Sequence, residues 1–91
     1  MTTDTVLYAL TTVQRKLVTA DYYDADQREE FCLSTDCLRD SLRAGDVTDF
    51  DNTIAQGMRH YPDRYDTILG ELFAVLGIDN RDQLSAILAA A

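Results

Sequence analysis

Aspartates recur with one spacing at two places in this sequence, and they are the residues best suited to chemistry. The stretch DYYDAD, residues 21–26, and the stretch DVTDFD, residues 46–51, both carry aspartate at the first, fourth and sixth positions. Clustered carboxylates are ligands that Ca²⁺ prefers. One hypothesis is therefore a metal-binding protein or an enzyme that uses these aspartates, with four of them as candidates: Asp24, Asp26, Asp49 and Asp51.

The spacing nevertheless differs from that of a calcium-binding EF-hand loop. Such a loop has glycine at its sixth position and glutamate at its twelfth. Counted from Asp21, these positions hold Asp26 and Cys32, and the second stretch departs from the pattern as well. Aspartate is also a preferred N-cap, and its charge is favourable in the first turn of a helix. We therefore expect two helix starts, and we predict no metal ligand and no cofactor.

A second candidate for chemistry is the single histidine. His60 stands beside Arg59, Tyr61 and Arg64, which makes a local basic cluster in an acidic chain. A catalytic histidine needs a nucleophile to activate or a carboxylate to orient it, and Asp63 is the one nearby candidate. We expect a surface histidine at the end of a helix, and we predict no catalytic residue.

The two cysteines predict neither a disulfide nor a metal site. Cys32 and Cys37 are five residues apart, so on one helix they point in directions about 140° apart. A structural zinc site needs four ligands, and the chain offers two cysteines and one histidine. We expect both cysteines to be ordinary helix residues.

The charge is negative and unevenly distributed. The net charge is -8, with a pI near 4.3. Residues 21–51 hold ten acidic residues against three arginines, a net charge of -7. Direct binding to nucleic acid or to an anionic membrane needs clustered lysine and arginine. The composition therefore argues against both, and it favours a protein partner with a basic surface, including a nucleic-acid-binding protein.

Length and composition predict a single domain over residues 1–91. The chain has 91 residues, of which 46% are hydrophobic, and this is enough for one core. Its start lacks the basic segment of a signal peptide, and the apolar run LFAVLGI is too short to span a bilayer. We predict a cytoplasmic protein. The excess of aspartate over glutamate, 13 to 3, is also typical of a salt-adapted composition.

Apolar residues recur at intervals of three and four along the whole chain, which is the helical period. Gly45 and Gly77 are placed to end helices, Pro62 to begin one, and Asn80 to cap another. The pattern predicts an all-α fold, a small compact bundle of four to five helices with short connections. The expected helices cover residues 6–20, 25–44, 46–61 and 62–76, and a region after residue 80.

The helix at 62–76 is predicted to be central, because its apolar face is wide enough to touch neighbours on two sides. That face comprises Tyr65, Ile68, Leu69, Leu72, Phe73, Val75 and Leu76. The preceding helix has a narrower stripe, made of Val47, Phe50, Ile54, Met58 and Tyr61.

The helix at 25–44 carries apolar and acidic residues side by side on the face opposite its main apolar stripe. The apolar residues are Leu33, Cys37 and Ala44, and the acidic residues are Glu29, Asp36 and Asp40. An apolar residue framed by carboxylates suits a basic, partly apolar partner surface. The competing interpretation is that the rest of the fold covers this face.

The leading functional hypothesis is a small, acidic, non-catalytic protein-binding module, an adaptor or an inhibitor. The predicted partner-binding residues are Glu29, Leu33, Asp36, Cys37 and Asp40. An alternative is a nucleic-acid mimic that blocks the DNA- or RNA-binding site of a target protein. A homo-oligomer is also possible, because a second copy could cover an apolar face.

Overall fold

The computed structural model describes residues 2–90, and over this range the chain forms five helices and no strand. The helices are α1 (Thr3–Thr19), α2 (Ala25–Arg43), α3 (Val47–His60), α4 (Pro62–Leu76) and α5 (Arg81–Ala89). The predicted all-α fold with short connections is confirmed, and five is the upper end of the predicted number of helices.

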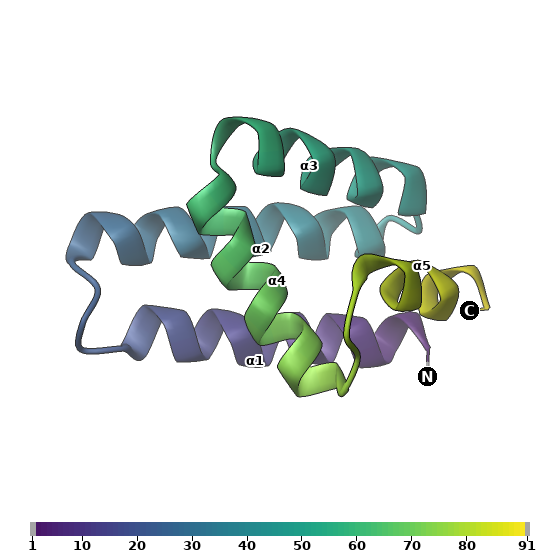
Figure 1. Cartoon of the computed structure of the whole chain (residues 1–91), viewed down its shortest axis with the longest axis horizontal. Coiled ribbons are helices and arrows are strands. Elements are labelled where there is room, and N and C mark those ends of the chain that lie inside the picture. The colour runs from purple at the N-terminus through teal and green to yellow at the C-terminus, as the bar shows by residue number, and fades with distance from the viewer. Residues whose placement is uncertain (1, 91) are drawn as a thin grey trace.

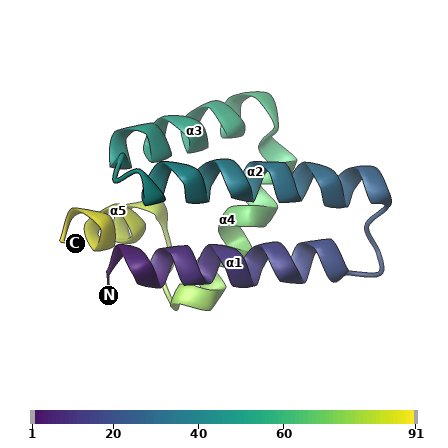
Figure 2. The ribbon, with the colours of Figure 1, turned by 180° about the vertical axis from the view of Figure 1, so that it is seen from behind.

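The helices are arranged around a long antiparallel pair. α1 and α2 lie side by side, and α3 packs along the other side of α2 (Figure 1). α4 crosses α2 and α1 obliquely, and the reverse view places it behind that pair (Figure 2). α4 contacts α1, α2 and α3, so its wide apolar face does touch several neighbours, as predicted. α2 also contacts three helices, namely α1, α3 and α4, so α4 is not the single central helix.

Both aspartate stretches are helix starts, as predicted. The Asp24 side chain accepts a hydrogen bond from the backbone N–H of Gln27 at 2.8 Å. Asp46 caps α3 in the same way, accepting from the backbone N–H of Asp49 at 2.9 Å. A capping carboxylate satisfies a backbone donor that would otherwise lack a partner at the start of a helix.

The predicted glycine stops are also confirmed. Gly45 has φ +74° after α2, and the next N–H, of Asp46, donates to the carbonyl of Ser41 at 2.9 Å. Gly77 has φ +69° after α4. A left-handed residue lets the chain turn back and satisfy the last carbonyls of a helix.

The buried core draws on all five helices. Its hydrophobic members are Val6, Ala9, Leu10, Val13, Leu17, Phe31, Leu38, Leu42, Phe50, Ile54, Tyr65, Ile68, Leu69, Leu72, Leu76, Leu84 and Leu88. The assignment of two residues to apolar stripes was wrong, because Tyr61 is 53% exposed and Val75 is 44% exposed. Tyr61 lies just beyond the last turn of α3, where the chain turns into α4, so its side chain leaves the stripe.

None of the helices within residues 2–90 combines the length and the apolar character needed to cross a membrane. The cytoplasmic location stays a prediction.

Candidate functional site

The outer face of α2 carries the five predicted partner-binding residues, and we call them the acidic strip: Glu29, Leu33, Asp36, Cys37 and Asp40. Leu33 is 59% exposed. Glu29, Cys37 and Asp40 are also exposed, and Asp36 is half-buried. The competing interpretation, that the fold covers this face, is therefore wrong for residues 2–90.

Asp36 differs from the other strip residues because its side chain accepts a hydrogen bond from another helix of the protein. The side-chain amide of Gln14, on α1, donates to Asp36 Oδ1 at 2.8 Å and to Thr35 Oγ1 at 2.9 Å. The Gln14 carbonyl oxygen in turn accepts from Arg39 Nη1 at 2.8 Å. These contacts join α1 to α2. Asp36 thus contributes to the helix interface as well as to the surface.

Glu29 and Asp40 are the freer carboxylates of the acidic strip. Glu29 forms no ion pair with any residue in the range 2–90. Asp40 pairs with Arg43 at 3.7 Å, but the two side chains are 75% and 57% exposed. Exposed pairs of this kind contribute little energy because water and salt screen them. Both carboxylates are accordingly available to an external cation.

A groove between α2 and α3 borders the acidic strip, and the sequence did not predict it. We call it the α2–α3 groove. Its volume is about 390 Å³, and its lining includes Cys37 and Asp40 of α2. On the other side it is lined by Asp46, the N-cap of α3, and by Asp49 in the first turn of α3. Asp49 also accepts a hydrogen bond from Ser41 Oγ. The short turn between α2 and α3 brings these carboxylates beside the strip, so the negative surface is wider than one helix.

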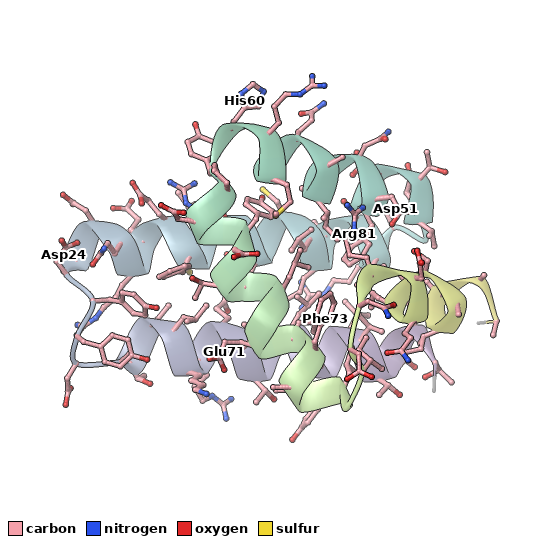
Figure 3. The ribbon with its side chains drawn as sticks, viewed as in Figure 1. Asp24, Asp51, His60, Glu71, Phe73 and Arg81 are labelled. Atoms are coloured by element: carbon pink, nitrogen blue, oxygen red, sulfur yellow. The ribbon has the colours of Figure 1, made fainter. Side chains whose placement is uncertain are left out.

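The four aspartates of the metal hypothesis do not meet. Asp24 lies at one end of the long axis of the molecule and Asp51 toward the other (Figure 3), and that axis extends 37 Å. Within residues 2–90, no group of three or more histidine, cysteine, aspartate or glutamate side chains is placed to hold a metal ion. Each stretch caps a helix, but Asp24 is the fourth residue of its stretch and Asp46 is the first of the other, so the equal spacing itself is a coincidence.

The two cysteines do not bridge. Both are free thiols; Cys37 is exposed, and Cys32 is half-buried. Cys32 Sγ lies 3.6 Å from the amide nitrogen of Gln14, so it faces α1. The prediction that they are separate helix residues is confirmed.

A second groove lies between the start of α2 and the corner where α3 meets α4, and we call it the tyrosine groove. Its volume is about 420 Å³, and its lining includes Tyr23, Glu30, Tyr61, Asp63 and Arg64. The Arg64 guanidinium carbon stands 4.2 Å from the centre of the Tyr61 ring, and its Nη2 lies 3.1 Å from Glu30 Oε2. This arrangement holds a planar cation between an aromatic face and a carboxylate.

His60 is at the end of α3, at the outer edge of the molecule (Figure 3). Its side chain is exposed, as predicted. Its ring stands 6.5 Å from that of Tyr61, in an edge arrangement. The Asp63 carbonyl accepts a hydrogen bond from Thr67 Oγ1 at 3.0 Å, and the absence of a catalytic role for His60 stays a prediction.

Comparison of the chain with protein-family models, with curated proteins and with solved structures finds no match.

Proposed function

We propose that this protein is a small, acidic, non-catalytic protein-binding module that docks on a basic surface of another protein through the acidic strip. The observation that carries the proposal is the exposure of Leu33, at 59%, between the exposed carboxylates of Glu29 and Asp40. Apolar anchors surrounded by complementary charge are typical of protein interfaces. The acidic strip combines both on a rigid helix.

The two kinds of group serve different steps of binding. Full burial of a leucine side chain contributes about 1.5 to 3 kcal/mol, and this contribution depends little on salt. The carboxylates attract a positively charged surface over a distance set by the ionic strength, so they mainly raise the association rate. The α2–α3 groove supports the proposal, because Asp46 and Asp49 enlarge the negative field beside Leu33.

The test is charge reversal at the free carboxylates. Glu29→Lys and Asp40→Lys together change the strip without touching the hydrogen bonds of Asp36 to α1. We expect the tagged protein to capture a basic partner from nuclease-treated source lysate at low salt. The amount of that partner captured by the double variant should fall by at least about tenfold, because charge complementarity is reversed at two sites.

The matched control reverses two exposed carboxylates elsewhere, with Asp66→Lys in α4 and Asp79→Lys in the turn before α5. It changes the net charge by the same amount. If the control and the strip variant lose the partner equally, only the overall charge matters and the assigned surface is wrong. If neither loses it at any salt concentration, the partner does not bind through charge.

The nucleic-acid mimic is the narrower form of this proposal, and the captured partner distinguishes it. A mimic competes with DNA or RNA for the same site. A partner that holds both this protein and a nucleic acid at once would leave the adaptor form in place and contradict the mimic.

A further inference from the structure

The tyrosine groove has the chemistry to hold a guanidinium group. Tyr61 exposes about half of its surface, and Tyr23 packs edge-on against Phe31 with ring centres 4.8 Å apart. The groove therefore presents two tyrosine rings, one from the turn before α2 and one from the α3–α4 corner. Aromatic faces attract cations through their quadrupoles, and guanidinium groups stack on them especially well.

The chain already places one guanidinium in this groove. Arg64 is held there by the ring of Tyr61 and by the carboxylate of Glu30, and its side chain is only 21% exposed. It demonstrates which ligand chemistry these walls accept. The groove is nevertheless not filled, since about 420 Å³ of space remains beside Arg64. This volume lies within the usual range for ligand sites, about 300 to 1,000 Å³.

The charge of the groove favours a second cation. Glu30 and Asp63 line it with two negative charges, and Arg64 offsets one of them. Asp63 is exposed and forms no ion pair with any residue in the range 2–90. A carboxylate beside an aromatic face therefore stands without a cation. His60 also lines the groove.

We propose that the tyrosine groove receives an arginine side chain of the basic partner, next to Arg64, with Asp63 as its carboxylate and the tyrosine rings as its walls. The inference rests on the proposed function, because the arginine belongs to the segment that covers the acidic strip. Glu30 and Leu33 are one helical turn apart, about 4.5 Å at 1.5 Å per residue. One basic segment running along α2 reaches both places.

The experiment is a titration of the isotope-labelled protein with N-acetyl-arginine amide, followed by two-dimensional amide NMR. We expect saturable shifts that cluster at Tyr23, Tyr61 and Asp63, and weaker ones with the lysine analogue. Tyr61→Leu should lower the affinity about two- to fivefold, as expected for an exposed cation–π contact. Tyr61→Phe, which keeps the aromatic face, should retain the affinity.

A second pair of variants tests the role of the Asp63 carboxylate. Asp63→Asn should weaken binding, whereas Asp66→Asn, one turn further along α4 and outside the groove, should not. Shifts that spread over all carboxylates without saturation, or equal shifts with norleucine amide, would overturn the assignment of an arginine site.

The two proposals fail separately. If the arginine probe does not bind while the Glu29→Lys, Asp40→Lys variant still loses its partner, the groove inference is wrong and the proposed function stands. If the probe binds in the groove but the strip variant keeps its partner, the acidic strip is not the docking surface.

Discussion

Gly57 is the residue on which the crossing of α3 and α4 depends. It is buried in α3, and a Cβ atom placed on it would lie 2.4 Å from the ring of Tyr65 in α4. Real contacts of this type are never so short, so the ring occupies the space that a side chain would need. The two helices approach closely because one of them has no side chain at the contact.

Gly57→Ala should therefore destabilise the protein. Alanine gains helix propensity over glycine, about 1 kcal/mol, but overpacking costs about 1 to 3 kcal/mol. We expect a net loss of up to about 2 kcal/mol in the free energy of unfolding, measured by urea denaturation.

Gly70→Ala is the matched control, because nothing lies within 4 Å of the Cβ position at Gly70 in α4. It should stabilise by about 0.5 to 1 kcal/mol. If both substitutions stabilise equally, the ring of Tyr65 does not rest on Gly57.

A residue-level contact also sets the register of α1 against α2. Gln14 donates to Thr35, which is fully buried, and accepts from Arg39. A sliding of one helix past the other would break the bonds of Gln14 to Thr35 and Arg39, and part-buried polar groups without a partner are costly. Thr35 would keep the hydrogen bond that its own hydroxyl donates to the carbonyl of Phe31 at 2.8 Å. The network thereby favours one alignment of two helices whose apolar stripes alone would tolerate several.

At the scale of elements, α4 is tied to α1 by an ion pair as well as by the core. Lys16 Nζ lies 2.6 Å from Glu71 Oε2, and Glu71 projects from α4 toward α1 (Figure 3). The hydrogen bond and the charge of Glu71 raise the pKa of Lys16 above its ordinary value of 10.5. The pair is exposed, so its contribution to stability is small and sensitive to salt.

The sign of the pH dependence follows from that shift. A raised pKa in the folded state means that the contribution of the pair is complete below pH 10.5 and is lost as the pH rises through the folded value. Lys16→Met should therefore destabilise slightly and constantly at neutral pH, and the difference from the unmodified protein should disappear at strongly alkaline pH.

Urea denaturation over a pH series measures this difference. Arg15→Met is the control, because Arg15 is exposed and forms no ion pair within residues 2–90. A Lys16→Met difference that persists above the raised pKa would show that the packing of the lysine stem, and not its charge, is what the substitution removes.

The last helix, α5, is short and contributes two residues to the buried core. α5 has nine residues, and its buried residues are Leu84 and Leu88. Isolated helices of this length are marginal in water, so α5 depends on contact with the rest of the core. Its start is nevertheless well defined, because Asn80 accepts from the N–H of Gln83 at 3.0 Å, as the sequence predicted.

At the scale of the whole molecule, the charge is concentrated on part of a compact body. The described residues extend 37 × 24 × 23 Å, and most of the net charge of -8 comes from residues 21–51. Like charges at this density repel one another and oppose the folded state, and salt weakens that repulsion. The same repulsion opposes contact between two acidic strips. The homo-oligomer stays a prediction, and association through this strip would be favoured by high salt, which screens the repulsion.

Salt should therefore stabilise this protein. We expect the urea midpoint to rise with sodium chloride between about 10 mM and 150 mM, where the screening length falls from about 30 Å to 8 Å. Glu29→Lys with Asp40→Lys brings the net charge from -8 to -4, and the rise should be smaller in this variant. An equal rise in both proteins would mean that the acidic strip does not contribute to the repulsion.

The sequence by itself determined the helices. Three helix starts are capped by side chains of the residue just before the helix, namely Asp24, Asp46 and Asn80. Two helices end at a glycine with positive φ, Gly45 and Gly77. These are local interactions among residues a few positions apart, so they can be read without knowing the fold. The helical period likewise predicted most of the buried residues and the exposed face of α2.

Only the tertiary structure decided which surfaces lie together. Gln14 meets Asp36 across 22 positions, and the tyrosine groove joins Tyr23 to Tyr61 from separate helix junctions. The sequence pattern placed Tyr61 in a core stripe and separated Asp49 from the acidic strip. Such contacts depend on how helices cross, and the crossing is set by the combined packing of many side chains, as at Gly57 and Tyr65.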